Sequence, residues 1–271
     1  MSLPKSVPVS VIIPCYKSGG TIRRAIASVM AQSLLPAEII FVDDASGDAS
    51  LDILKNMVAE NPAIMRFISL TENVGAASAR NIGWAASTQS YIAFLDSDDA
   101  WHPDKLKVQY QYMASNPDVC LSGHGHRILN IEQTSTWALS DVTAVSVSKW
   151  QMLLSNRFVT PSVMVRRDIA ERFIDGQRYM EDHMLWLSIV CSGKSVSKLS
   201  IDLAALYKPA FGANGLSAQI WLMEREDLAN YWRVYKKNWI GVYSVSFLVM
   251  YSCVKYLRRL LMYWGYLRWR A

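Results

Sequence analysis

Short apolar runs and segments with helical spacing alternate over residues 7–95. The runs are rich in β-branched residues, which favours strands, whereas the segments between them repeat apolar residues at helical intervals, as Ile22, Ile26 and Val29 do. The pattern predicts strands at 7–16, 37–46, 65–70 and 91–95, and helices at 19–34, 47–61 and 74–87. Near-continuous apolar strands separated by helices are typical of a parallel sheet covered on both faces, so we expect an α/β fold.

The pattern becomes less regular after residue 103 and then turns helical. Helices are expected from Pro103 to about Asn116, over 180–193 and over 217–238, with strands within 119–131 and 161–168. The sequence His124–Gly125–His126 favours a surface strand. These changes in pattern divide the chain into a body, 1–217, with halves 1–116 and 117–217, and a helical tail, 218–271.

Composition narrows the class of protein. Half of the 271 residues are apolar, enough for a folded core, and the four cysteines are scattered, without a CxxC pair. This spacing predicts reduced thiols and neither a disulfide framework nor a zinc site. The N-terminus lacks the apolar stretch of a secretory signal, so we expect a cytoplasmic protein.

Charge is distributed unevenly along the chain. Residues 228–271 hold eight Lys and Arg and no Asp or Glu, which more than accounts for the net charge of +5, so residues 1–227 are net acidic. Twelve of the thirty aromatic residues also lie in 228–271. A basic, aromatic segment suits either nucleic acid or a membrane interface.

Carboxylates follow two of the predicted strands. Asp43 and Asp44 end the second strand, and Asp96, Asp98 and Asp99 come directly after the fourth. Ligands bind at the carboxyl ends of parallel strands, so we expect both groups to line one crevice. The chain has no GxGxxG after a strand and no P-loop, so a nucleotide would be held by side chains and a metal rather than by a glycine-rich phosphate cradle.

The sequence Asp96–Ser97–Asp98–Asp99 suits Mg²⁺ or Mn²⁺ bound to a diphosphate, because hard cations prefer oxygen ligands. One alternative is an Asp-rich turn that caps the following helix. Another is a haloacid-dehalogenase-type phosphatase, which is disfavoured because Ala100 occupies the Thr or Val position of that motif and the motif follows the fourth strand instead of the first.

Three segments in order resemble the family 2 glycosyltransferases, nucleotide-sugar enzymes of the GT-A fold. They are "VSVIIPCYKSGGTIRRAIASVMAQSLLPAEIIFVDDASGD", "ENVGAASARNIGWAA" and "YIAFLDSDDAWHPDKL". The similarity covers about residues 7–110 and continues weakly to about 217 through "MEDHMLWL" and "LYKP…GLS". It implies a mostly parallel Rossmann-like sheet flanked by helices, and a nucleotide-sugar donor.

The resemblance assigns roles at the donor side. Asp44 matches the position that holds the base, which favours UDP without excluding GDP, whereas Asp43 is expected to cap a turn. Pro14 and Tyr16 would pack on the nucleotide, and Arg80 would lie near the base and diphosphate. Asp96 and Asp98 would meet the nucleotide-sugar and the metal, with Asp99 a further metal-ligand candidate; Asp96 and Asp99 stay unranked.

The resemblance also assigns the acceptor side. Asp182, in "EDHMLW", matches the general base of an inverting transfer, a carboxylate with a pKa near 4. Glu181 would hold the acceptor or orient the base, Trp186 would form an apolar platform for a sugar, and Lys208 would contact the diphosphate. Glu-Asp in a first helical turn also suits the helix dipole, and Trp186 also suits a core.

The tail is interpreted as lying on the inner leaflet of the membrane rather than binding nucleic acid. Tyr251, Val254, Leu257, Leu261 and Trp264 share one helical face, with Lys255, Arg258 and Arg259 on another. Residues 238–254 are uncharged but at the lower limit for a span. A helical hairpin that closes the fold or a homodimer is the alternative.

Together these features predict an inverting, metal-dependent transfer of a sugar, most simply from UDP, to a lipid-linked or polysaccharide acceptor in surface-glycan synthesis. The alternatives are a non-catalytic relative that binds glycans or membranes, and the phosphatase.

Overall fold

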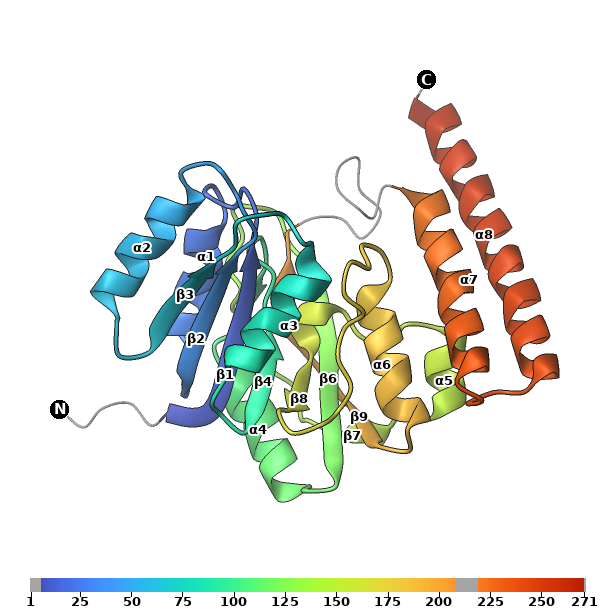
Figure 1. Cartoon of the computed structure of the whole chain (residues 1–271), viewed down its shortest axis with the longest axis horizontal. Coiled ribbons are helices and arrows are strands. Elements are labelled where there is room, and N and C mark those ends of the chain that lie inside the picture. The colour runs from blue at the N-terminus through green and yellow to red at the C-terminus, as the bar shows by residue number, and fades with distance from the viewer. Residues whose placement is uncertain (1–5, 208–218, 271) are drawn as a thin grey trace.

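The computed structural model describes residues 6–207 and 219–270, and for 262–270 the course of the helix alone. Within these residues nine strands form one sheet in the order β3-β2-β1-β4-β8-β6-β9-β5, with β7 paired to β9 (Figure 1). The strands are β1 Ser6–Cys15, β2 Leu35–Asp43, β3 Met65–Ser69, β4 Tyr91–Phe94, β5 Ala100–Trp101, β6 Val119–Ile128, β7 Ala144–Ser146, β8 Met164–Arg166 and β9 Ser195–Leu206. The helices are α1 Ile22–Met30, α2 Ser50–Glu60, α3 Ala76–Ala86, α4 Lys105–Ser115, α5 Lys149–Leu154, α6 Glu181–Cys191, α7 Ile220–Lys236 and α8 Val242–Arg270, with a 3₁₀ turn at Thr160–Ser162.

The first half of the sheet is parallel, as predicted, with β1 between β2 and β4 and β3 outside β2. Alternate residues of β1 face opposite layers, because side chains of a strand alternate between the two faces. Val11 and Ile13 belong to the core under α1, α2 and α4, whereas Ile12 belongs to the core under α3 and α6. An added Cβ at Gly83 would lie 2.6 Å from Ile12 Cγ2, so α3 approaches β1 at a distance that glycine allows.

The second half of the sheet is mixed. β8 runs antiparallel to β4 and β6, while β9 is parallel to β6 and antiparallel to β5 and β7. The expected α/β class is confirmed, and the parallel character belongs mainly to the first half. The expected strand at His124 is confirmed as part of β6, but its expected surface position is wrong: this side chain is 1% exposed, and burial lowers its pKa to about 3.

The two last helices pack against the body as a hairpin, at the side opposite β3 (Figure 1). Tyr231 and Val234 of α7 and Leu248 of α8 are fully buried in the same core cluster as Trp186 of α6. The inner face of the predicted tail is therefore continuous with the core of the body. The division of the chain at residues 116 and 217 stays a prediction. In the part of the chain that the structure describes, no helix has the length and apolar character needed to cross a membrane.

Candidate active site

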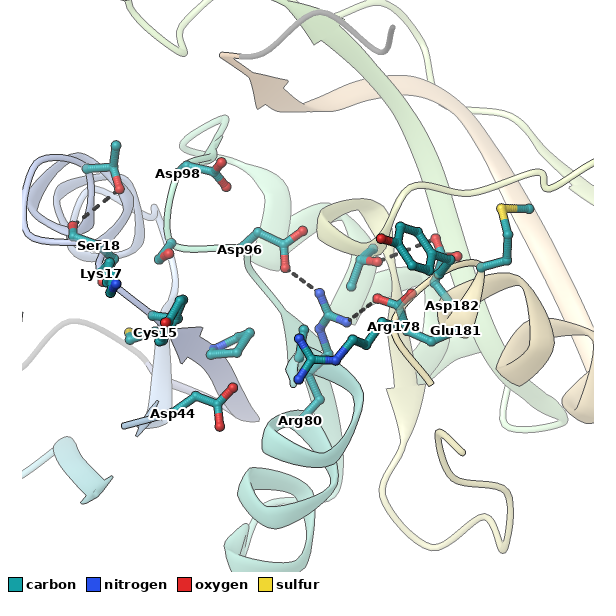
Figure 2. Close-up of a pocket in the computed structure, with 18 of the residues that line it drawn as sticks. Cys15, Lys17, Ser18, Asp44, Arg80, Asp96, Asp98, Arg178, Glu181 and Asp182 are labelled. Carbon is teal, nitrogen blue, oxygen red and sulfur yellow. Dashed lines mark hydrogen bonds and ion pairs between the residues drawn. The ribbon is translucent and has the colours of Figure 1, made fainter. Parts of the chain in front are cut away.

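A cavity of about 590 Å³ opens at the carboxyl ends of β1, β2 and β4 and extends to the start of α6 (Figure 2). Its position confirms that the acidic ends of β2 and β4 meet at one crevice. Most of the residues predicted for the site line it: Pro14, Tyr16, Asp44, Arg80, Asp96, Asp98, Glu181 and Asp182. Asp99 and Trp186 do not line it, and Lys208 lies outside the described residues.

Arg80 joins the two acidic sides of the cavity. It is 4% exposed on α3, and its guanidinium donates to Asp96 Oδ1 at 2.6 Å and to Glu181 Oε1 at 3.1 Å. Figure 2 shows the guanidinium between these two carboxylates. The resemblance placed Arg80 near the base and diphosphate, which stays a prediction; the structure adds that Arg80 pairs with two carboxylates 85 residues apart in the chain.

Asp44 is held at the bottom of the cavity by the start of α3. Its Oδ1 accepts from the Val74 amide at 2.7 Å and its Oδ2 from the Gly75 amide at 2.9 Å. Gly75 has a φ of +86°, a conformation that favours glycine. Each carboxylate oxygen keeps a second lone pair, so the group can still accept an N–H from a nucleotide base. Asp43 instead accepts from the Ser46 hydroxyl at 2.5 Å, closing the turn as expected.

The three carboxylates after β4 differ in position. Asp96 is paired with Arg80, Asp98 faces the cavity, and Asp99 is 5% exposed with its amide donating to the Asp96 carbonyl at 3.1 Å. Arg24 fixes this turn by donating to the Asp98 carbonyl at 2.6 Å. The described residues include no group of three or more His, Cys, Asp or Glu side chains that could hold a metal by themselves. One or two carboxylates do fit Mg²⁺ or Mn²⁺ whose remaining ligands are phosphate oxygens and water.

Glu181 and Asp182 open α6 at the far wall of the cavity. Met180, just before them, has a φ of +52°, a strained turn of the kind found at functional sites. Asp182 Oδ1 accepts from the His183 amide at 2.6 Å, and Oδ2 accepts from the Asn156 amide at 3.2 Å and the Thr160 hydroxyl at 3.5 Å. Burial raises the pKa of both carboxyl groups, so the expected Asp182 pKa near 4 is wrong and the group is a stronger base.

Trp186 is fully buried in the core and does not face the cavity. Its ring lies 6.5 Å from that of Phe94 and 6.2 Å from that of Phe173, measured between centroids. The expected sugar platform is therefore wrong, because Trp186, the sixth residue of α6, points into the core and not into the cavity that Glu181 and Asp182 line.

Sequence reasoning missed several residues of the cavity. Lys17 follows Tyr16 in the first loop, and Arg178 reaches over the cavity and donates to Asn73 Oδ1 at 3.3 Å. The available signal for Lys17 was its position next to Tyr16, which was predicted to pack on the nucleotide; Arg178 precedes the predicted acceptor residue Glu181 by three positions and had no such signal. Asn156 and Thr160 reach Asp182 from a segment that carries no motif, so only the folded chain reveals them.

Comparisons with known proteins bear on the family of this chain. The family model "Glycosyl transferase family 2" matches residues 10–173. The putative teichuronic acid biosynthesis glycosyltransferase TuaG of Bacillus subtilis is 30% identical over 233 residues, which are 85% of each chain.

Two solved structures share the fold. S. aureus TarS 1–349 in complex with UDP-GlcNAc has a TM-score of 0.64 at 18% identity, over 82% of this chain and 66% of that one, so this chain spans about two thirds of it. The Pyrobaculum calidifontis mannosyltransferase PcManGT, in complex with GDP-Man and Mn²⁺, has a TM-score of 0.63 at 15% identity, over 93% and 75% of the two chains. The expected GT-A fold is thus confirmed, and the chain belongs to the family 2 glycosyltransferases.

Proposed function

We propose that this glycosyltransferase transfers a sugar from UDP to a glycan acceptor with inversion, and that Asp182 is the general base. The observation that carries the proposal is the placement of Asp182 and Asp98 on opposite sides of one cavity, with Asp44 at its base (Figure 2). A direct displacement needs a base on the face of the sugar opposite the leaving diphosphate. This arrangement separates those two tasks between α6 and the turn after β4.

The chemistry follows from these positions. The acceptor hydroxyl oxygen bonds to the anomeric carbon as the bond from that carbon to the diphosphate oxygen breaks. The hydroxyl proton passes to Asp182, and the electron pair leaves with UDP. Asp98, with Asp96, would hold a divalent cation, which neutralises charge on a leaving diphosphate when bound. We rank Asp99 last among these ligands because it is buried outside the cavity.

The donor and acceptor are inferred from different observations. A carboxylate oxygen of Asp44 can accept a hydrogen bond from the N–H of uracil. The TarS neighbour is in complex with UDP-GlcNAc, whereas PcManGT is in complex with GDP-Man. We therefore favour UDP over GDP. The relative TuaG is named for teichuronic acid synthesis, which supports a lipid-linked or polysaccharide acceptor in surface-glycan synthesis.

A thermal-shift panel of UDP and GDP with and without Mn²⁺ tests the donor site. Ligand at a hundredfold excess over its Kd stabilises a protein by about 2.7 kcal/mol, so binding is readily detected. We expect UDP with Mn²⁺ to give the largest rise in Tm, and transfer from a UDP-sugar to be measurable. Metal-dependent UDP binding without transfer or hydrolysis of any UDP-sugar would favour the non-catalytic alternative, and phosphate release from simple monoesters would favour the phosphatase.

Asp98→Asn is expected to remove the Mn²⁺-dependent part of the UDP-induced Tm rise while the protein alone melts as before. The reason is that an amide is a much weaker ligand than a carboxylate for a hard cation. Asp104→Asn is the matched control, because Asp104 lies six residues further on at the start of α4 and does not line the cavity. An unchanged Mn²⁺ effect in Asp98→Asn would remove Asp98 as a ligand.

The outer face of α8 supports the proposed attachment to an anionic membrane surface. Six apolar residues separated by steps of three or four form one exposed stripe: Tyr243, Phe247, Met250, Val254, Leu257 and Leu261. Arg258 is exposed beside the stripe, whereas Lys255 turns inward and donates to the Leu154 carbonyl at 3.2 Å, which corrects its predicted place on the basic face. Tyr251 is half-buried and not part of the stripe, and the Trp264 side chain lies outside the described part of the chain.

The charge of α8 favours a membrane surface over a second copy of the chain as the partner of the stripe. Helix α8 carries basic residues and no acidic ones, so two copies meeting along the stripe would bring like charges together, whereas an anionic leaflet would attract them. We therefore propose that the enzyme lies on the inner leaflet through α8.

Val254→Glu with Leu257→Glu is expected to reduce binding to phosphatidylglycerol vesicles by tenfold or more, because burial of each such side chain contributes about 1.5–3 kcal/mol. Vesicle flotation measures the change. Ile131→Glu is the control, since Ile131 is 76% exposed in the loop after β6 and away from the stripe in sequence. Two outcomes would contradict the membrane proposal. In one, the unchanged protein does not float with the vesicles; in the other, it elutes as a dimer and the double substitution makes it a monomer.

A further inference from the structure

His183 immediately follows the proposed base, yet its side chain points away from the cavity. It belongs to α6, is 1% exposed, and its ring packs against α5 and α7. Its Nε2 lies 2.8 Å from the Met152 carbonyl oxygen, and its Nδ1 lies 3.1 Å from Asp227 Oδ1 on α7. The proposed function uses neither His183 nor Asp227.

The two contacts fix the protonation of the ring. A carbonyl oxygen only accepts hydrogen bonds, so Nε2 must carry a proton. An ionised carboxylate also only accepts, so Nδ1 must carry a proton as well, and the ring is then an imidazolium cation. Asp227 is 4% exposed, and its Oδ2 lies 3.3 Å from the Tyr231 hydroxyl and 3.4 Å from the Ser252 hydroxyl. Both hydroxyls have a closer acceptor, the Leu153 carbonyl at 3.0 Å and Glu224 Oε1 at 2.7 Å, so His183 is the main partner of this carboxylate.

We propose that His183 and Asp227 form a buried imidazolium–carboxylate pair that positions Asp182 and keeps it ionised, an inference that rests on the proposed role of Asp182 as base. The mechanical link is short, because the amide of His183 itself donates to Asp182 Oδ1 at 2.6 Å. Anchoring the ring at both nitrogens therefore fixes the amide that holds the base. His183 and Asp227 are positioning residues, since neither lines the cavity.

The surrounding charges agree with this assignment. The hydrogen bond to Asp227 raises the pKa of His183 despite its burial, and the same contact lowers the pKa of Asp227. The charge of His183 lowers the pKa of Asp182 against burial, as does Arg80 from α3, and the charge of Asp182 in turn raises the pKa of Glu181. Lys255 of α8 and Glu224 of α7 also lie close to Asp227, and α5 presents only its backbone carbonyl to the ring.

The protonation of His183 can be measured without any assay of transfer. The chain has four histidines, so ¹⁵N-histidine labelling gives few signals, and His183→Gln identifies the one of interest. We expect both ring nitrogens of His183 to stay protonated to a higher pH than those of an ordinary histidine, whose pKa is about 6.5. A neutral ring at pH 7.5 would overturn the proposal, whatever the protein catalyses.

The effect on the base is measured by the pH profile of kcat/KM. In His183→Gln and Asp227→Asn, loss of the cation should raise the acid limb of the profile by about one pH unit or more, since a nearby charge shifts a carboxyl pKa by that amount. Tyr231→Phe is the matched control, because it removes a hydroxyl from Asp227 but keeps the pair, and its acid limb should not move. Folded variants with lower activity but an unmoved acid limb would overturn the proposal, and inactivity of the unchanged protein would instead count against the proposed function.

Discussion

Asp182→Asn is expected to lower kcat for sugar transfer by between about a hundredfold and ten thousandfold while UDP binding is retained. The amide cannot take the proton of the acceptor hydroxyl, but it has the same shape and can still accept from the His183 amide. Donor binding is unaffected because Asp44 and Asp98 lie on the other side of the cavity. Steady-state kinetics with a UDP-sugar and the UDP-induced Tm shift measure the two effects.

The matched control for this variant is Asp175→Asn, an exposed carboxylate in the loop that leads to α6. It should retain activity.

The pH dependence of the unchanged enzyme adds a second check. Because the active form of the base is ionised, activity should fall as pH decreases through the pKa of Asp182. Burial raises this pKa, so the fall should occur at a higher pH than the pKa of an ordinary aspartate would give. Full activity of Asp182→Asn would remove Asp182 as the base.

Arg80→Met is expected to lower the free energy of unfolding by about 3–5 kcal/mol at pH 8, the usual cost of removing one partner from a buried ion pair. The substitution leaves Asp96 and Glu181 facing each other without the cation between them. Urea unfolding measures the loss. Arg166→Met is the control, because Arg166 pairs with Asp168 on the surface and such pairs contribute at most about 1 kcal/mol.

The loss in Arg80→Met should shrink as pH falls. Burial raises the pKa of Glu181 and Arg80 opposes that rise, so without Arg80 the folded protein binds a proton at Glu181 that the unfolded chain has already released. Stability then falls as pH rises from the unfolded pKa, about 4, through the raised folded value. Adding Glu181→Gln should restore part of the stability at pH 8. If Arg80→Met loses the same stability at pH 5 and at pH 8, the Arg80 side chain stabilises the fold through packing and not through its charge.

The parts of the fold that depend on local pattern were predictable. The apolar runs of β1 to β4 and the helical spacing of α1 to α3 are properties of each segment, so these elements match the predicted ranges closely. Strand β5 has two residues, and strand β7 has three residues, all of them exposed. Both strands form by pairing with β9, which lies much later in the chain. No local signal could reveal them.

The site divides in a similar way. Motif residues such as Asp44, Asp98 and Asp182 were found because the family pattern marks their positions. The partners of Arg80 were not, because Glu181 is 101 residues away and only the packing of α6 against α3 brings it close. Trp186 was misassigned for the same reason: its type and spacing suit a sugar platform or a core, and the orientation of α6 decides between them.

The two layers of the core end at different points along the chain. Among the described residues, the cluster under α1, α2 and α4 contains nothing beyond Ala204, whereas the cluster around Trp186 extends to Leu248 of α8. As the chain leaves the ribosome, the first layer can close once β9 has emerged, but the layer behind Asp182 must wait for α7 and α8. The proposed base can therefore take its final position only after α8 has been made, later than the strands that end in Asp44 and precede Asp98.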